Sequence, residues 1–463
     1  MHPVFVAAGT AKDAVPIWFV TAANWDDLRA RLDTAARSHI IATGFEPRPG
    51  RHLVLPAVSG RLGGVLLGIE RAETPGKDLF GPGRLVEVLP AGTYRFANAP
   101  HDARLAALAF ALGSYRFTRY RKSEAKAVRL ELPKDVDGEE LTRIADGVNL
   151  ARDIVNTPAN DMGPAELEEA VRRLAQLHGA HARSLTGDDL ARENFHLIHA
   201  VGAAAAPSRA PRLLDLTWGE PSAPKVTLVG KGVCFDSGGL DIKSEHGMLL
   251  MKKDVGGAAT VLALAHMIMD SKLRLRLRAL IPAVENAISG AAMRPLDVYR
   301  SRKGVTVEIG NTDAEGRLIL ADALAFADEE APELLINLGT LTGSARVALG
   351  PDLPPFYTDD ESLAAKVAHF AAVENDPLWR MPLWRPYDSM LDSKVADFSN
   401  VASGSFAGSI ICALFLKRFV EAAKAWLHFD IYAWTPSAKP GRPEGGECQA
   451  ARALYALLKE RYG

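Results

Sequence analysis

A series of short apolar segments, separated by stretches with the spacing of helices, limits the folds open to this chain more than any other feature. Apolar side chains run almost without interruption through most of them, which indicates strands of a sheet that helices cover on both faces. The segments are Leu213–Leu216, Val226–Val229, Leu277–Ile281, Leu334–Asn337 and Trp426–Ile431. We therefore predict an α/β fold whose larger, C-terminal domain has a central mixed sheet flanked by helices.

The first 137 residues show shorter β-rich runs that alternate with helical ones, a pattern typical of a small α/β domain. The β-rich runs are Ile17–Thr21, Leu53–Pro56, Gly64–Ile69 and Val128–Leu132, and the helical ones are Asp26–His39 and Ala103–Tyr120. Apolar residues at helical spacing from Gly138 then predict one long helix, which Pro158 stops. The expected organisation is an N-terminal domain over residues 1–137, a connecting helix over 138–160 and a C-terminal domain over 161–463.

Composition excludes several classes of protein. The chain has 463 residues, of which 48% are hydrophobic and 24% charged, with a formal net charge of -2. This balance gives no electrostatic footprint for nucleic acid, so no such partner is expected. The three cysteines are widely spaced, as is usual in a reducing compartment. No segment resembles a signal peptide or a membrane span, so we expect a cytoplasmic protein without a membrane partner.

The stretch Gly310–Leu318 concentrates chemistry in nine residues, with sequence GNTDAEGRL. It follows Val305–Ile309, an alternating segment that predicts a strand, and it precedes an apolar run with helical spacing. Its charged residues therefore belong to a strand-to-helix turn, and ligands of open α/β sheets bind at such turns. A helix cap formed by the same carboxylates is the alternative that this stretch alone leaves open.

A second charged cluster supports the chemical interpretation. Lys231 and Asp236 lie around an extended segment, and Asp254 stands just before a Gly-Gly pair and a long apolar helix. Together with Asp313 and Glu315, the chain thus offers four carboxylates near strand ends or helix starts. Oxygen-rich ligand sets with few His or Cys residues are typical of divalent ions such as Mg²⁺, Mn²⁺ and Zn²⁺. Four carboxylates suggest two ions.

These segments resemble the metal-binding motifs of the leucyl aminopeptidase family, a family of dinuclear metallo-exopeptidases. The order and the gaps of the motifs agree, and the resemblance covers most of residues 150–463. Two departures bear on substrate preference: Asn337-Leu-Gly precedes Thr340 where the family commonly has Asp-x-Ala, and the tail from Gly445 to Ala450 agrees only loosely. The motifs are Gly230–Gly239, Lys243, Asp254–Ala259, Asn311–Leu318, Asn156–Asn160 and Thr340–Gly343.

The resemblance implies a role for each residue of the two clusters. It implies that Lys231, Asp236, Asp254 and Glu315 hold a tightly bound ion, and that Asp236, Asp313 and Glu315 hold a more exchangeable one. The ions would be Zn²⁺ or Mn²⁺, with Mg²⁺ as a further candidate. Lys243 would stabilise an oxyanion, and Arg317 would hold a bicarbonate that acts as the base. The positions that match the family's substrate side-chain pocket are Met251, Thr340 and Leu341.

The activity implied by the resemblance is release of N-terminal leucine, or another apolar residue, from peptides by a homohexamer. Residues 161–463 would then be the metallopeptidase catalytic domain. Two alternatives remain open from the residues alone. A dinuclear phosphoesterase would use paired ions equally well, although the sequence supplies no evident phosphate-binding loop. A family member with a DNA-regulating or structural role would keep the site as a relic.

Overall fold

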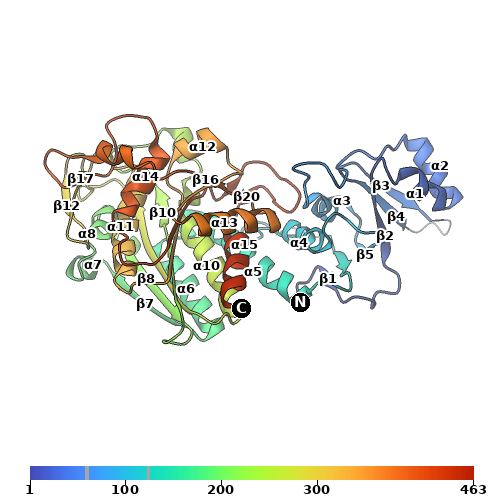
Figure 1. Cartoon of the computed structure of the whole chain (residues 1–463), viewed down its shortest axis with the longest axis horizontal. Coiled ribbons are helices and arrows are strands. Elements are labelled where there is room, and N and C mark those ends of the chain that lie inside the picture. The colour runs from blue at the N-terminus through green and yellow to red at the C-terminus, as the bar shows by residue number, and fades with distance from the viewer. Residues whose placement is uncertain (58–61, 123–125) are drawn as a thin grey trace. The chain divides into compact units, whose positions relative to one another are not determined.

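The computed structural model describes residues 1–57, 62–122 and 126–463, which form two compact units (Figure 1). The first unit consists of Met1–Asn149 together with Ser437–Glu444. The second consists of Leu150–Pro436 together with Gly445–Gly463. A short segment from the C-terminal part of the chain, 437–444, thus belongs to the first unit, which the sequence gave no reason to expect. None of the helices described has the length and apolar character needed to cross a membrane.

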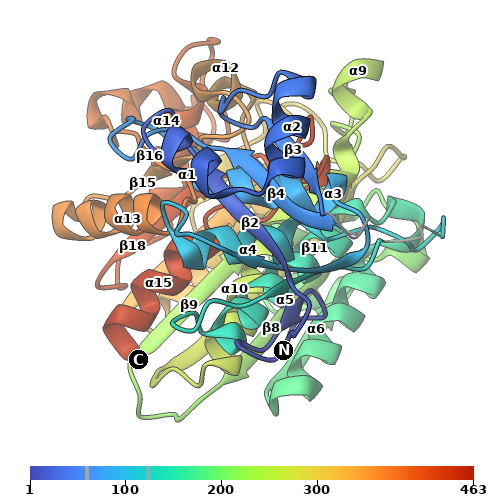
Figure 2. The same cartoon turned by 90° about the vertical axis from the view of Figure 1, so that its right-hand side faces the viewer.

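The first unit is built on a six-stranded sheet in the order β1-β6-β5-β2-β4-β3, in which only the β3–β4 pair is antiparallel. Helix α2 lies beside β3 and β4 (Figure 2), and its Ala36 and Ile40 share a core cluster with Leu55 and Leu66 of these strands. The strands are β1 (Phe5–Val6), β2 (Val15–Val20), β3 (His52–Pro56), β4 (Leu62–Gly68), β5 (Gly92–Phe96) and β6 (Val128–Glu131). The helices are α1 (Trp25–Arg31), α2 (Thr34–Thr43), η1 (Gly81–Arg84), α3 (Leu85–Val88) and α4 (Ala103–Gly113).

Two helical predictions for this unit differ from the structure. The predicted helix Asp26–His39 is two helices, because Asp33 caps α2 by accepting a hydrogen bond from the Ala36 backbone. The predicted helix Ala103–Tyr120 ends at Gly113. Helix α5 (Gly138–Asn156) begins where the sequence predicts and ends two residues before Pro158, because a residue that precedes proline disfavours the helical conformation.

The second unit contains the predicted mixed sheet, in the order β16-β15-β18-β14-β9-β11-β8-β7. Its strands β9, β14 and β18 are parallel and almost completely buried. β10 pairs with β11 beyond the end of β9, so β9 and β10 are successive strands along one longer neighbour. The strands are β7 (His181–Thr186), β8 (Arg212–Trp218), β9 (Lys225–Gly230), β10 (Gly232–Asp236), β11 (Arg276–Asn286), β14 (Leu334–Gly339), β15 (Pro355–Tyr357), β16 (Trp379–Arg380) and β18 (Trp426–Asp430).

Helices cover both faces of this sheet, as the apolar strands predict (Figure 1). One face packs against α8, α11 and α14, whose apolar residues share a single core cluster with the strands. The other face packs against α10, which is buried along nearly its whole length. The helices of the unit are η2 (Ala159–Asp161), α6 (Pro164–His178), α7 (Asp188–Arg192), α8 (His196–Gly202), η3 (Pro207–Arg209), α9 (Glu245–Met248), η4 (Met251–Val255), α10 (Gly256–Asp270), α11 (Glu315–Asp328), α12 (Gly343–Leu349), α13 (Glu361–Val373), η5 (Arg385–Leu391), α14 (Gly408–Lys417) and α15 (Ala451–Tyr462).

One predicted strand lies outside the central sheet. The strand that leads into the GNTDAEGRL stretch, β13 (Thr306–Glu308), does not belong to the central sheet. It lies in a separate three-stranded sheet between β12 (Val298–Arg300) and β17 (Phe398–Ser399). Only three of its residues pair, and an alternating segment this short carries no information about which sheet it joins. A two-stranded sheet of β19 (Trp434–Thr435) and β20 (Gly445–Gly446) completes the strands described.

A buried ion pair within the second unit yields a stability prediction. Arg152 and Glu447 are 3.0 Å apart, with side chains 0% and 5% exposed. Replacing Arg152 with Met leaves the Glu447 carboxylate buried without this partner, which should lower the free energy of unfolding by about 3–5 kcal/mol. The double variant R152M/E447L should regain much of that loss, because it removes both charges.

Calorimetry on the wild type, R152M and R152M/E447L measures the free energy of unfolding of each. The matched control is R173M, which breaks the pair between Arg173 and Glu169, both largely exposed, and should cost about 0–1 kcal/mol. A loss for R152M no larger than that for R173M would show that the buried pair contributes little.

Candidate metal centre

Three segments of the second unit bring the four predicted carboxylates together. Asp236 is the last residue of β10, and Asp254 lies on η4 directly before α10. Asp313 occupies the turn before α11, and Glu315 is the first residue of that helix. One carboxylate oxygen from each of Asp236, Asp313 and Glu315 lies within 4.8 Å of the other two. The acidic cluster predicted from sequence is therefore a local cluster in the fold.

Lys231 occupies the inner side of this cluster, in the gap between β9 and β10. Its Nζ lies 2.8 Å from Asp254 Oδ2 and 2.8 Å from Glu315 Oε1. It also donates to the carbonyl oxygen of Thr340 at 2.6 Å. Burial by itself would lower the pKa of Lys231, but the charges of Asp254 and Glu315 outweigh it and raise the pKa above its ordinary value. The Lys231 amine thus lies within hydrogen-bond distance of two predicted metal ligands.

Lys243 occupies the outer side. Its Nζ lies 2.8 Å from Asp236 Oδ2 and also contacts Asp313 Oδ1. Its side chain is 14% exposed, compared with 3% for Lys231, so the two lysines differ in access to solvent. Burial would lower the pKa of Lys243, but Asp236 and Asp313 raise it above its ordinary value, which keeps the amine charged at neutral pH.

The two lysines do not balance the negative charge of the site. Four carboxylates face two ammonium groups. The excess of negative charge raises the pKa of two of the carboxyl groups. Burial and the charge of Asp236 raise the pKa of Glu315 to about 8, and the same two causes raise the pKa of Asp313 to about 6. Among the residues that the structure describes, Glu315 Oε2 is buried without a hydrogen-bond partner. Buried, uncompensated carboxylate oxygens are the donors that divalent cations bind, so the residues present fit such ions.

Neighbouring groups orient two of these carboxylates in the same way. Asp236 Oδ1 accepts hydrogen bonds from Asn286 Nδ2 at 2.9 Å and from the Gly238 backbone at 2.8 Å. Asp254 Oδ1 accepts from Thr340 Oγ1 at 2.6 Å. In both, Oδ2 is left to face a lysine. Such hydrogen bonds fix the carboxylate plane and are a normal support of metal ligands.

Gly316, which separates Glu315 from Arg317, lies so close to Lys231 that a side chain at this position would clash with it. A Cβ atom on Gly316 would lie 2.5 Å from both Nζ and Cε of Lys231. Any larger residue would therefore displace the lysine from Glu315 and Asp254. The first turn of α11 thus contains the predicted ligand Glu315 and also leaves the space that the inner amine fills.

The remaining predicted residues lie around this centre. Arg317, in the first turn of α11, is buried and donates through NH1 to the carbonyl oxygen of Asn400 at 2.8 Å. Thr340 contacts both Lys231 and Asp254, as given above, and the Leu341 backbone donates to Asp430 Oδ1. Met251 begins η4, the turn that carries Asp254. Among the described residues, its side chain makes no hydrogen bond to the carboxylates.

Sequence reasoning missed three residues that support the site: Asn286, Asn400 and Asp430. Asn286 could have been found, because it ends β11 exactly opposite Asp236 in a parallel pair, where strand ends share an edge. Asn400 follows β17 and accepts the Arg317 hydrogen bond. Asp430 ends β18 and accepts from the backbones of Leu341 and Thr342. The last two belong to segments without any recognisable motif.

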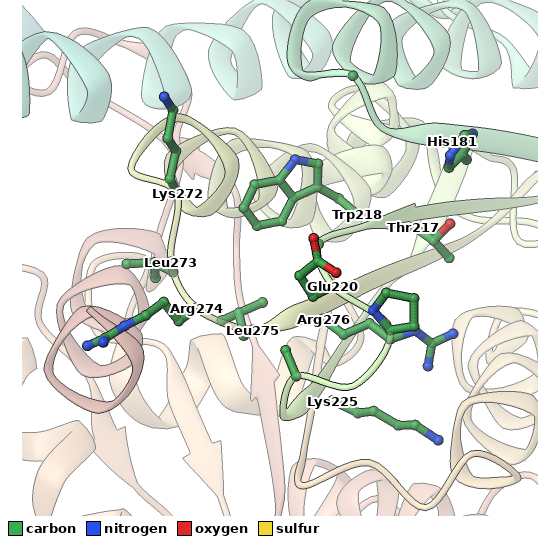
Figure 3. A pocket seen from close by; sticks show the side chains of 14 residues that line it. His181, Thr217, Trp218, Glu220, Lys225, Lys272, Leu273, Arg274, Leu275 and Arg276 are labelled. Atoms are coloured by element: carbon green, nitrogen blue, oxygen red, sulfur yellow. The ribbon is translucent and has the colours of Figure 1, made fainter.

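A large pocket of about 990 Å³ lies at the opposite end of the central sheet, where β9 and β11 begin (Figure 3). It has Trp218 on its wall and several basic residues around it, but two of these are already engaged. Arg276 pairs with the Glu330 carboxylate, and Lys225 donates to the Glu330 carbonyl oxygen. The carboxylate centre is at the other end of these strands, so this pocket takes no part in it.

Comparison with protein families gives two matches. The family model described as "Cytosol aminopeptidase family, catalytic domain" matches residues 149–455. The model described as "M17 aminopeptidase, N-terminal domain" matches residues 15–133. Two curated relatives, both named "Probable cytosol aminopeptidase", come from Roseiflexus castenholzii and Rhizobium etli. The first is 39% identical over 75% of this chain and 74% of its own length, and the second 41% identical over 71% and 69%.

Solved structures agree in fold. The crystal structure of cytosol aminopeptidase from Coxiella burnetii superposes with a TM-score of 0.94 and 45% identity, over 99% of this chain and 100% of that one. The bottromycin maturation enzyme BotP in complex with Mn superposes with a TM-score of 0.85 and 32% identity, over 97% and 100%.

The close approach of Gly316 to Lys231 gives a prediction for this site. Gly316→Ala should push the Lys231 amine away from Asp254 and Glu315, and so weaken binding of Mn²⁺ in calorimetric titrations. Ala in a helix is intrinsically more stable than Gly by about 1 kcal/mol, so helix propensity does not account for such a loss. The control is Gly290→Ala, where an added methyl group meets open space. Equal Mn²⁺ affinity in both variants would contradict the proposed packing.

Proposed function

We propose, on the premise that this chain belongs to the cytosol aminopeptidase family of metal-dependent hydrolases, that it is a dinuclear aminopeptidase that prefers N-terminal leucine or other apolar residues. Membership of the family makes the chain an aminopeptidase that acts on peptides. The number of ions and the preferred residue are the parts that we propose. The observation that carries the first part is the set of four carboxylates around two lysines, with Glu315 Oε2 unpartnered among the described residues.

The inner and outer lysines suggest how the ligands divide. We assign Lys231, Asp236, Asp254 and Glu315 to a tightly bound ion, since the Lys231 amine already contacts Asp254 and Glu315. Lys231 would bind this ion as a neutral amine, because the charge of the ion would displace the amine's proton. The second, more exchangeable ion would take Asp236, Glu315 and Asp313, whose oxygens lie within 4.8 Å of one another. Asp236 and Glu315 would then serve both ions. Mn²⁺ and Zn²⁺ are the candidates, and the Mn complex of BotP supports the first.

Lewis-acid polarisation of a carbonyl and the supply of a nucleophilic water at neutral pH are the chemistry that two divalent ions provide in such a site. The chain's own residues would do the rest. Lys243 stays protonated beside Asp236 and Asp313, so it can stabilise negative charge that develops on the scissile carbonyl oxygen. Arg317 uses NH1 for Asn400, and its planar guanidinium has further N–H groups that could hold a bicarbonate as the base.

Substrate preference rests on the segments beside Asp254. Met251 precedes Asp254 on the same turn, and Thr340 and Leu341 follow β14. Thr340 Oγ1 donates a hydrogen bond to Asp254, and the Leu341 N–H donates to Asp430. These two bonds hold the backbone of Thr340 and Leu341 in place. We propose that these three residues contact the N-terminal side chain of the peptide, and that an apolar wall there favours leucine or methionine.

We further propose a homohexamer located in the cytoplasm. Large apolar side chains of the second unit are exposed on segments after β10 and before α14, as expected for surfaces that subunits cover. Examples are Leu249 at 73% exposed, Val395 at 69% and Phe406 at 82%. Light scattering measures the mass of the assembly directly.

Hydrolysis of a fluorogenic leucine amide tests the proposal. We expect activity that disappears on chelation and returns with Mn²⁺ or Zn²⁺, together with two ions per chain by elemental analysis of the loaded protein. Hydrolysis of a phosphate ester without hydrolysis of the amide would favour a phosphoesterase, and inactivity on both would favour a structural or DNA-regulating role. One ion per fully loaded chain would rule out the dinuclear arrangement.

Alanine variants separate ligands from catalytic groups. Asp313→Ala should lower both bound metal and activity, because it removes a proposed ligand. Arg317→Ala should keep its metal and lose about 10²- to 10⁴-fold in kcat, the usual effect of a positioned acid or base, and Lys243→Ala should behave similarly. The contact between Arg317 and Asn400 allows a purely structural role instead. A lower melting temperature with unchanged kcat in Arg317→Ala would establish that role.

A further inference from the structure

The side chain of Asn400 makes four hydrogen bonds to residues 310–314, which we call the metal-binding turn because it carries the proposed ligand Asp313. The Asn400 side chain is completely buried. Its Oδ1 accepts from the backbone N–H groups of Gly310 at 2.8 Å and Asn311 at 3.2 Å. Its Nδ2 donates to the carbonyl oxygens of Asn311 at 2.8 Å and Ala314 at 3.4 Å. All of the amide's hydrogens and its carbonyl oxygen are therefore directed at a single turn.

The backbone of the same residue extends this connection on either side of the turn. The Asn400 N–H donates to the Glu308 carbonyl on β13 at 2.9 Å. The Asn400 carbonyl oxygen accepts from Arg317 on α11 at 2.8 Å. One residue thus contacts the strand before the turn, the turn itself and the first turn of the helix after it. Asp313 and Glu315 both lie between these points of attachment.

The opposite side of the turn has its own attachment, to the segment that carries Lys243. Thr312 Oγ1 donates to the Gly238 carbonyl at 2.6 Å and accepts from the Asp241 N–H at 2.8 Å. The Thr312 N–H also donates to Asp241 Oδ2 at 2.7 Å, and the Thr312 carbonyl accepts from Asn286 Nδ2 at 3.1 Å. All four of these bonds are made by Thr312, so this side fixes the turn at that one residue. The backbone on both sides of Asp313, from Gly310 to Ala314, is fixed by the Asn400 amide. Loss of that amide would therefore weaken the support of the backbone that carries the carboxylates of Asp313 and Glu315.

We propose that Asn400 is a positioning residue for the reaction: its amide sets the geometry of Asp313 and Glu315, and its carbonyl sets that of Arg317. This inference rests on the proposed function, since it assigns metal ligation to Asp313 and Glu315. Removal of such an indirect support typically lowers metal affinity or activity by about 10- to 100-fold. The side-chain amide and both backbone polar groups of Asn400 bond to the turn, to β13 and to Arg317, so its contribution reaches the reaction through the groups that it holds.

The test compares Asn400→Asp with a matched control. The Asp side chain has nearly the same shape, but it would place a carboxylate oxygen against the carbonyls of Asn311 and Ala314. Asn98 in the first unit has the same bonding pattern, because its Oδ1 accepts from the Phe19 N–H and its Nδ2 donates to the Phe19 carbonyl, each at 2.8 Å. Asn98→Asp therefore places a carboxylate oxygen against a backbone carbonyl in the same way, at a half-buried position outside the metal-binding turn.

Three quantities are measured on each protein: melting temperature, Mn²⁺ affinity by calorimetric titration, and kcat and KM for a leucine amide. We expect Asn400→Asp to lose about 10- to 100-fold in Mn²⁺ affinity and to lower kcat, with KM changed much less. Asn98→Asp should lower the melting temperature and leave Mn²⁺ affinity and kcat unchanged. If Asn400→Asp does not fold, Asn400→Ser, which adds no charge, should show the same pattern.

Wild-type Mn²⁺ affinity and kcat in a folded Asn400 variant would overturn the positioning role, whatever its melting temperature. Equal losses of affinity in the Asn400 and Asn98 variants would also overturn it, since they would reflect general destabilisation. A wild-type protein that binds no Mn²⁺ and hydrolyses no amide refutes the proposed function itself, and this inference with it. The two failures are therefore distinguishable from the wild-type measurement alone.

Discussion

The second unit depends on one electrostatic constraint: four carboxylates from three segments must lie close together in a buried place without driving those segments apart. Lys231 meets this constraint on the inner side, with its amine 2.8 Å from Asp254 and from Glu315. An isolated carboxylate in such surroundings is costly, so each one needs a cation nearby. The amine also binds the Thr340 carbonyl, and in this way it connects η4, α11 and the end of β14. The geometry of the centre thus follows from the need to compensate charge.

The backbone arrangement explains why Lys231 is able to do this. β9 ends at Gly230 and β10 begins at Gly232, so Lys231 lies at the junction of two strands that follow one another along β11. Its N–H donates to the Leu338 carbonyl on β14, and its own carbonyl accepts from Ala258 on α10. The backbone is therefore held from both sides. Only the side chain remains free to enter the space that Gly316 leaves open.

Much of the fold and of the candidate centre could be predicted from the sequence, for reasons that particular residues make clear. Val226–Val229 and Leu334–Asn337 are buried by their apolar character, so their place in a covered sheet follows from composition. The charged residues lie in short motifs, and the family resemblance attached roles to them. Asn400 and Asp430 could not be found in this way, because their contacts join segments about 90 residues apart. The same holds for β13, whose partner β17 is equally distant in sequence.

The small three-stranded sheet positions Asn400 beside the turn of residues 310–314. β13 leads into the turn of residues 310–314, which carries the proposed ligand Asp313, and β17 pairs with β13 in parallel and leads into Asn400. Because parallel strands run in the same direction, residues that follow them emerge at the same edge. Asn400 is thereby placed beside Gly310 and Asn311, where its amide can bond their backbones. The central sheet supplies Asp236, and the small sheet supplies the turn with Asp313, so the centre forms only where both are folded. Ions bound there would stabilise this folded state over any in which the two sheets separate, because only the joined state contains the complete set of ligands.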